Sequence, residues 1–296
     1  MAFHSLEEIQ KSCREKNVLF WRAVLLEDMA DRSVTETESM QSMQQMWTAM
    51  KSASEQYDRT QVSASGLVGK MGAQMEEYRQ SKEPLCGPFV SKVIARALEM
   101  GESNACMKRI VAAPTAGSSG VIPGTLCALQ EQYGFTDDEI CQALFNAAAI
   151  GYLITRNATT AGAEGGCQAE VGSASAMAAS AAVELFGGTP RQCMDAASFA
   201  MVNILGLVCD PIGGLVENPC QNRNAMGASN ALISAELSLA GVKSITPIDE
   251  TIGVMYAVGR SIPSELRETS LGGMAVAKSA CENCMACANK RNKMKK

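Results

Sequence analysis

The stretch TDDEICQALFNAAAIGYLI, residues 136–154, is the clearest indication of the fold class of this chain. Thr136 and Glu139 have the spacing of a capping box, in which a hydroxyl and a carboxylate satisfy the free backbone N–H groups at the start of a helix. The apolar run from Ile140 to Ile154 that follows predicts a helix packed against a core. The chain therefore contains at least one long, well-capped and largely apolar helix.

The rest of the chain has the same helical character. A Thr-Pro pair at 189–190 and another at 246–247 each predict a helix start, with proline at the first helical position behind a threonine cap. Ser5 and Glu8 form a further capping box, which predicts one helix as far as about Met29. Methionines recur at intervals of three and four as a helical stripe, used for packing or as a partner surface, at Met40, Met43, Met46 and Met50.

The composition supports an all-α fold. Aromatic residues make up only 5% of the 296 residues, whereas Ala, Gly, Ser and Met are abundant. This balance favours helices packed through small side chains over a β-sandwich built on aromatic and β-branched residues. We therefore expect a mainly helical protein.

Charge and targeting signals exclude several classes of protein. A net charge of −5 argues against a general nucleic-acid binder, which usually presents a broad basic face. The N-terminus lacks the basic and apolar succession of a secretory signal, which predicts a cytoplasmic protein. The apolar stretch at 196–209 is too short to cross a membrane and is interpreted as a core helix. No membrane association is expected.

The chain has twelve cysteines, and in a reducing compartment they are not expected to form a disulfide framework. Four with apolar neighbours are predicted to be packing residues, namely Cys106, Cys127, Cys141 and Cys193. Three others lie beside Gly- and Pro-rich loops and are expected at loop-to-helix junctions, which favour thiolates, namely Cys167, Cys209 and Cys220. Their spacing matches no short metal motif, so spacing alone leaves structural cysteines and metal ligands equally open.

Three stretches resemble the signature blocks of the iron–sulfur-dependent L-serine dehydratases, in particular of their α chain. They are RIVAAPTAGSSGVIPG (109–124), NATTAGAEGGCQAEVGSASAMAA (157–179) and GLVCDPIGGLVENPCQNRNAMGASNA (206–231). The resemblance implies that Cys167, Cys209 and Cys220 hold a [4Fe–4S] cluster with one iron free of protein ligands. It also implies that this cluster acts as a Lewis acid in the deamination of L-serine to pyruvate and ammonia, in a chain that works with a separate β chain.

The resemblance divides the chain into three parts and assigns a substrate loop. Residues 1–80 are expected to be a helical N-terminal extension, 81–280 a cluster-binding catalytic domain with Gly/Pro-rich loops converging on the cluster, and 281–296 a Cys-rich basic tail. The substrate site is assigned to Thr115, Ser118, Ser119, Gly120 and Asn157, with Glu164 a further candidate. From sequence alone, the loop that carries the two serines is better interpreted as a tight turn with capping hydroxyls, and the resemblance reverses that interpretation.

No general base is evident among these blocks. The single histidine, His4, lies outside them and is expected to be exposed to solvent. We therefore expect the base to come from the β chain.

The tail contains a C-x-x-C-x-x-C run at Cys281, Cys284 and Cys287, which resembles part of a ferredoxin ligand set. This run is compatible with a second cluster, with an adventitious metal site and with no metal site at all. Two alternatives to serine dehydration follow from the cysteines: a cluster-dependent cysteine desulfidase, and an iron–sulfur electron carrier.

Overall fold

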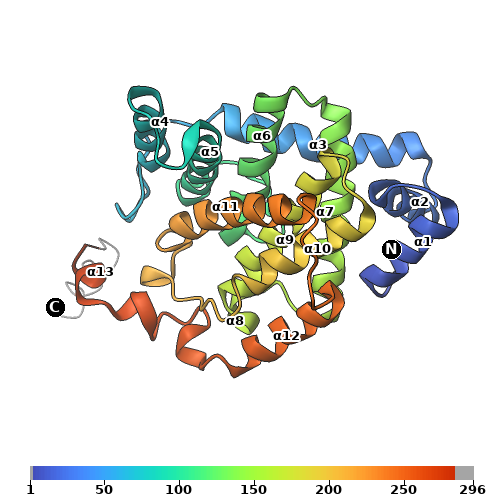
Figure 1. Ribbon diagram of the computed structural model, residues 1–296. Coiled ribbons are helices and arrows are strands. Elements are labelled where there is room, and N and C mark those ends of the chain that lie inside the picture. Colours follow the sequence, from blue (N-terminus) through green and yellow to red (C-terminus); the bar gives the residue numbers. More distant parts are fainter. Residues whose placement is uncertain (1–2, 284–296) are drawn as a thin grey trace.

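The computed structural model describes residues 3–283 and is built from helices (Figure 1). Over this range it contains no strand, and its β pairings are two isolated bridges, Val62 with Gly69 and Cys209 with Arg267. The all-α prediction is confirmed. The α-helices are α1 (Leu6–Lys16), α2 (Phe20–Arg32), α3 (Glu36–Glu55), α4 (Met71–Ser81), α5 (Gly87–Ala105), α6 (Val121–Tyr133), α7 (Asp137–Asn157), α8 (Gly162–Gly165), α9 (Ser173–Leu185), α10 (Pro190–Val202), α11 (Cys220–Leu239), α12 (Ile248–Ser261) and α13 (Lys278–Asn283).

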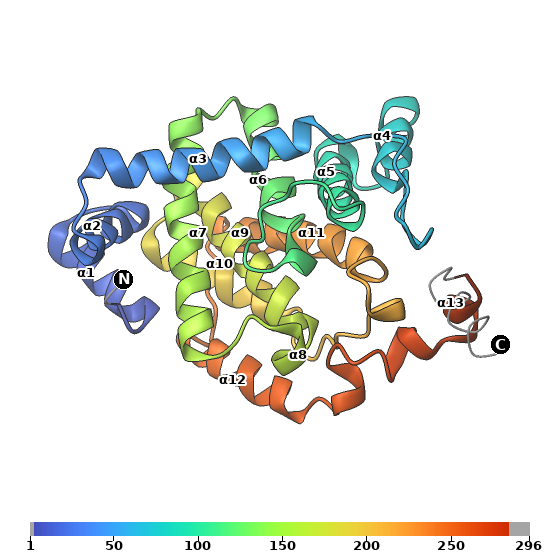
Figure 2. The same cartoon turned by 180° about the vertical axis from the view of Figure 1, so that it is seen from behind.

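Helix α9 forms the centre of the bundle and packs against α6, α7, α10 and α11 (Figures 1 and 2). Every residue from Ser173 to Val183 is buried, and most of them are Ala or Ser. The distance between packed helices depends on the side chains at the contact, so these small residues let four neighbours approach α9 closely. Helix α3 crosses one side of the bundle and α12 the opposite side (Figures 1 and 2).

The N-terminal helices share the core of the rest of the chain. Leu6 and Phe20 are fully buried, Trp47 is 1% exposed, and all three belong to one hydrophobic core that extends as far as Met255. The division of the chain at residue 80 stays a prediction. None of the helices in the described part of the chain is long and apolar enough to span a membrane.

Three helix starts lie where the sequence places them, and the first is that of α1, whose N-cap Ser5 accepts from the Glu8 N–H. The capping box of Thr136 and Glu139 begins α7, and Thr189 caps α10 with Pro190 at its first position. Helix α12 begins one residue later than predicted, because Pro247 has an extended backbone and is itself the N-cap. The capping residues therefore fix these boundaries to within one residue.

Two expectations about helix length are wrong. The single helix predicted from Ser5 to Met29 is divided into α1 and α2, because Asn17 adopts a left-handed conformation with φ of 51° and ends α1. The core helix predicted over 196–209 ends at Val202, and turns lead from there to Cys209. Asparagine tolerates the left-handed region better than most residues, so the break at Asn17 has a local cause.

The cysteines predicted to be packing residues are mostly in the core. Cys127, Cys141 and Cys193 are at most 4% exposed, which confirms the prediction for them, whereas Cys106 is only half-buried. The methionines of the stripe on α3 differ in burial, since Met50 is buried and Met46 is 46% exposed.

Candidate functional site

The three candidate ligand cysteines are buried and come from three separate segments. Cys167 is 1% exposed and lies between α8 and a helical turn, η2 (Gln168–Gly172). Cys220 is 6% exposed and is the first residue of α11. Both lie at the start of helical structure, as predicted.

Cys209 is placed differently from the prediction. It is 3% exposed and lies in an extended segment, where its N–H donates to the Leu266 carbonyl at 2.8 Å and its carbonyl accepts from the Glu268 N–H at 2.6 Å. The expected loop-to-helix junction is therefore wrong for this residue. Its position is set by backbone pairing with a segment almost 60 residues further along the chain, which local sequence does not reveal.

Two of these thiols meet a buried carboxylate. The Sγ atoms of Cys167 and Cys209 and a carboxylate oxygen of Glu170 all lie within 4.8 Å of one another. Glu170 Oε2 is 4.0 Å from Cys167 Sγ and 3.8 Å from Cys209 Sγ. Cys220 is outside this group, but burial, together with the charge of Cys167, raises the pKa of its thiol to about 12. The site thus combines three thiols and one carboxylate.

Glu170 was not singled out from the sequence. It follows Cys167 by three residues, a spacing that places two side chains on one face of a helical turn, and this is the signal that could have found it. Burial raises the pKa of Glu170 above that of an ordinary glutamate, and hydrogen bonds from Thr115 and Cys209 act in the opposite direction.

The loop assigned to substrate adjoins this group. The Thr115 and Ser118 hydroxyl oxygens lie 3.1 Å apart, and a Cβ at Gly117 would lie 3.2 Å from both carboxylate oxygens of Glu170. Ser118, Ser119 and Gly120 are buried. Among the described residues, the Ser119 hydroxyl has no hydrogen-bonding partner, which is costly for a buried hydroxyl unless a ligand or water supplies one. The structure therefore brings the serine-containing loop and the thiols together in one site.

The remaining candidates are exposed to solvent. Asn157 is the exposed last residue of α7, and its side-chain amide donates to the backbone carbonyl of His4 at 2.9 Å. Glu164 is also exposed. His4 is exposed, as expected, and its ring contacts Arg156 at 2.5 Å.

A buried ion pair supports the extended segment of Cys209. Arg223, three residues after Cys220 on α11, pairs with Asp210 at 2.7 Å and donates to the Val208 carbonyl at 2.9 Å. Burial lowers the pKa of Arg223, but the charge of Cys167, together with the contact with Asp210, outweighs burial and raises it. The guanidinium therefore places a positive charge beside the thiols, which favours their thiolate forms.

This donor set fits an iron–sulfur cluster. Such clusters are held by cysteine thiolates, and here the thiols of Cys167 and Cys209 meet at Glu170, while Cys220 is buried and its thiol is affected by the charge of Cys167. Gly162 keeps the space beside them open, because a Cβ at that position would lie 2.8 Å from Glu170 Oε2 and 2.9 Å from Cys209 Sγ. The tail cysteines cannot be placed in the same way, since Cys284 and Cys287 and the side chain of Cys281 lie outside the described residues.

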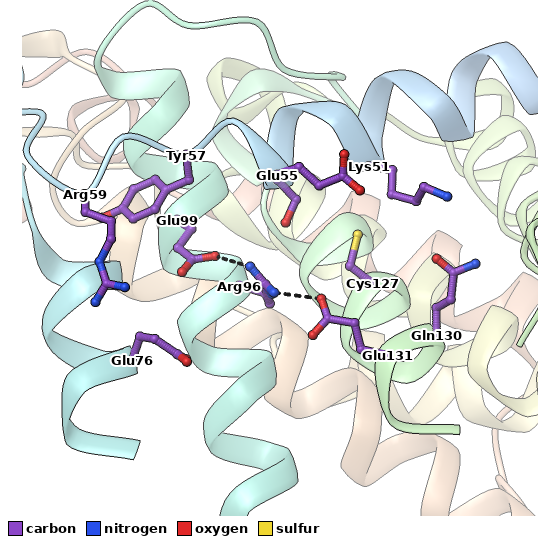
Figure 3. Close-up of a pocket in the computed structure, with 11 residues that line it drawn as sticks. Lys51, Glu55, Tyr57, Arg59, Glu76, Arg96, Glu99, Cys127, Gln130 and Glu131 are labelled. Carbon is purple, nitrogen blue, oxygen red and sulfur yellow. Dashed lines mark hydrogen bonds and ion pairs between the residues drawn. The ribbon is translucent and has the colours of Figure 1, made fainter. Parts of the chain in front are cut away.

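A polar pocket elsewhere on the molecule does not coincide with this site. It has a volume of about 510 Å³ and lies among α3, α4, α5 and α6 (Figure 3). Arg96 crosses it and pairs with Glu99 at 3.0 Å and with Glu131 at 2.8 Å. Its lining contains none of the predicted substrate or ligand residues. The candidate active site is therefore the group formed by the thiols, Glu170 and the serine loop.

Comparison with known proteins gives a consistent result. Residues 11–275 match the family described as "Serine dehydratase alpha chain". The "Probable L-serine dehydratase, alpha chain" of Bacillus subtilis is 43% identical over 273 residues, which cover 92% of this chain and 91% of the relative. The "L-serine dehydratase, alpha chain" of Peptoniphilus asaccharolyticus is 45% identical over 276 residues, which cover 93% and 94%.

A longer relative matches in part. The "L-serine dehydratase" of Helicobacter pylori strain J99 is 34% identical over 280 residues, which cover 92% of this chain but only 61% of the relative. The family match spans most of the chain and includes every residue of the thiol and loop site. This chain belongs to the serine dehydratase alpha chain family.

Proposed function

We propose that this chain is the α subunit of an L-serine ammonia-lyase that converts L-serine to pyruvate and ammonia. The observation that carries the proposal is the proximity of the predicted substrate loop to Glu170 of the ligand group, since a Cβ at Gly117 would lie 3.2 Å from both carboxylate oxygens of Glu170. The sequence predicts the loop and the cysteines from separate blocks, and in the fold they adjoin. Family membership and the names of the relatives support serine as the substrate.

In this proposal Cys167, Cys209 and Cys220 hold a [4Fe–4S] cluster. When bound, the cluster supplies a Lewis acid that polarises the hydroxyl group of serine. The loop hydroxyls of Thr115, Ser118 and Ser119, with the backbone of Gly120, bind the carboxylate of the substrate. Asn157 remains a weaker candidate, because its described hydrogen bond is to His4.

The chemistry requires the α-proton and the hydroxyl of serine to leave. Their loss gives aminoacrylate, which tautomerises and hydrolyses to pyruvate and ammonia without further help from the protein. A base must take the α-proton, and the described part of this chain has no histidine at the site, since His4 is exposed at the N-terminal end. We therefore assign the base to a β chain.

A second chain is also supported by the lengths of the relatives. This chain matches relatives named as alpha chains over almost their full length, but only 61% of a relative named simply L-serine dehydratase. The remainder of that longer protein is the part that a β chain would supply. Within this chain we propose 81–280 as the catalytic part, 1–80 as a helical extension and 281–296 as a tail.

A reducing compartment suits the cysteines. The nine cysteines whose side chains are described are all free thiols. An oxygen-sensitive site of this kind is expected in the cytoplasm. The names of the relatives favour serine dehydration over the two alternatives, cysteine desulfidation and electron transfer.

The proposal is tested by anaerobic purification of the chain with its β partner, followed by assays of iron, sulfide and pyruvate. Serine, threonine and cysteine are supplied in parallel. We expect serine to be the best substrate, and preferred release of sulfide from cysteine would favour the desulfidase instead. Reversible reduction of the cluster without lyase activity would favour the electron carrier.

A further inference from the structure

The side-chain amide of Asn224 joins the serine loop to the helix that begins at Cys220. Asn224 lies on α11, one turn after Cys220, and is 2% exposed. Its Oδ1 accepts from the Gly120 N–H at 2.8 Å, and its Nδ2 donates to the Gly117 carbonyl at 2.8 Å. The same Nδ2 donates to the Cys220 carbonyl at 2.9 Å. One buried amide therefore holds both ends of the loop and the backbone of a candidate ligand.

The two loop contacts enclose Ser118 and Ser119. Gly117 directly precedes these serines and Gly120 directly follows them, so the orientation of both hydroxyls depends on the two anchored ends. The loop also fits tightly at Gly120, because a Cβ there would lie 2.4 Å from the Ala97 carbonyl oxygen and 3.0 Å from Asn224 Oδ1. At Gly120 the loop thus lies between α5 and α11 with no space for an added side chain.

We propose that Asn224 is a positioning residue of the serine site, which sets the distance between the loop that binds the substrate carboxylate and the ligand helix. This inference rests on the proposed function. An amide is suited to the role because it donates and accepts at once, whereas a carboxylate at the same place would face the carbonyl oxygens of Gly117 and Cys220 without a proton to donate. A displacement of about 1 Å in a substrate-positioning group can lower the rate by about a hundredfold.

Asn230 provides a matched control. It lies on the same helix, is 8% exposed, and its Nδ2 donates to Ser175 Oγ at 2.9 Å and to the Ala200 carbonyl at 2.8 Å. Replacement of Asn230 thus removes a buried, bonded amide from α11 without touching the serine loop. An effect that arises from lower global stability should appear in the Asn224 and the Asn230 variants alike. An effect that arises from displacement of the loop should appear only in the Asn224 variants.

The test compares Asn224→Ala, Asn224→Asp and Asn230→Ala by two measurements. The first is hydrogen exchange of the Gly120 amide in the chain without its cluster, where Asn224→Ala should accelerate exchange at least about tenfold and Asn230→Ala should not. The second is steady-state kinetics of the iron-loaded α/β enzyme. There, both Asn224 variants should raise the KM for serine about tenfold or more while iron content stays at the wild-type level.

The outcomes separate this inference from the proposed function. If the wild-type enzyme forms pyruvate but the Asn224 variants keep its KM, or match Asn230→Ala in both measurements, the role of Asn224 is overturned. If Asn224→Ala does not fold, Asn224→Asp decides the matter, since it keeps an acceptor for Gly120 and loses the donor to Gly117. If the wild-type enzyme forms no pyruvate from serine, the proposed function itself fails.

Discussion

Glu184 should make the stability of this protein fall as the pH rises towards neutrality. It lies near the end of α9, where its Oε2 accepts from Asn146 Nδ2 at 2.6 Å and from the Trp21 N–H at 3.3 Å, with Cys193 Sγ at 3.9 Å. Burial raises the pKa of this carboxyl from 4.5 to about 7, and the hydrogen bonds only partly oppose that rise. The described residues around it supply no cation to compensate its charge.

The direction of this pH dependence follows from the pKa values of Glu184 in the unfolded and in the folded protein. Between pH 4.5 and about 7 the folded protein keeps a proton on Glu184 that the unfolded chain has released, so the free energy of unfolding decreases as the pH rises through this window. The full shift in the pKa of Glu184 corresponds to about 3 kcal/mol of unfolding free energy, and this stability is lost once the pH is above 7. Glutamine resembles the protonated carboxyl, so Glu184→Gln should remove this loss.

The assay is urea unfolding of the cluster-free chain at pH 5 and at pH 8. We expect Glu184→Gln to be within about 1 kcal/mol of the wild type at pH 5 and more stable by about 3 kcal/mol at pH 8. Glu139→Gln is the control, because hydrogen bonds from Thr136 lower the pKa of Glu139, and this variant should not gain stability as the pH rises. Equal stability of Glu184→Gln and the wild type at pH 8 would refute the reasoning.

The remaining predictions concern the site. Replacing any one of the three candidate ligand cysteines by serine should abolish iron retention and activity together, whereas Cys141→Ser should leave the iron content nearly intact; full iron in a ligand variant would contradict the assignment. Ser118→Ala and Thr115→Val should keep the cluster and lose about 1–3 kcal/mol of transition-state stabilisation for each hydroxyl that contacts the substrate, measured as kcat/KM; unchanged kinetics in both would remove the loop from the site. Gly162→Ala should lower iron incorporation, because its Cβ would crowd Glu170; normal incorporation would show that the space is not needed.

Local sequence signals identified helix starts well and helix ends less well. The capping box at Thr136 and the Thr-Pro pair at 189–190 fix backbone N–H groups within a few residues, so their effect is visible in sequence. The break at Asn17 depends on one left-handed residue, and apolar periodicity continues past it. A helix pattern therefore shows where a helix forms more reliably than where it stops.

The site was only partly accessible from sequence. The resemblance singled out Cys167 and Cys209, but the extended pairing that holds Cys209 comes from residues 266–268, far away in the chain. The only local signal for Glu170 is its three-residue spacing from Cys167, and Asn224 acts through contacts with the loop at 117–120 that its own neighbourhood does not reveal. Long-range contacts of this kind become visible only in the folded chain.

The most direct test of the account is pyruvate formation from L-serine by the anaerobic chain with confirmed cluster occupancy, measured before and during titration with the β chain. The account predicts a cluster on the α chain alone, little or no pyruvate, and a rise in activity that saturates as the β chain reaches equal amounts. Full activity of the α chain alone, unchanged by the partner, would contradict both the two-chain assignment and the placement of the base on the β chain.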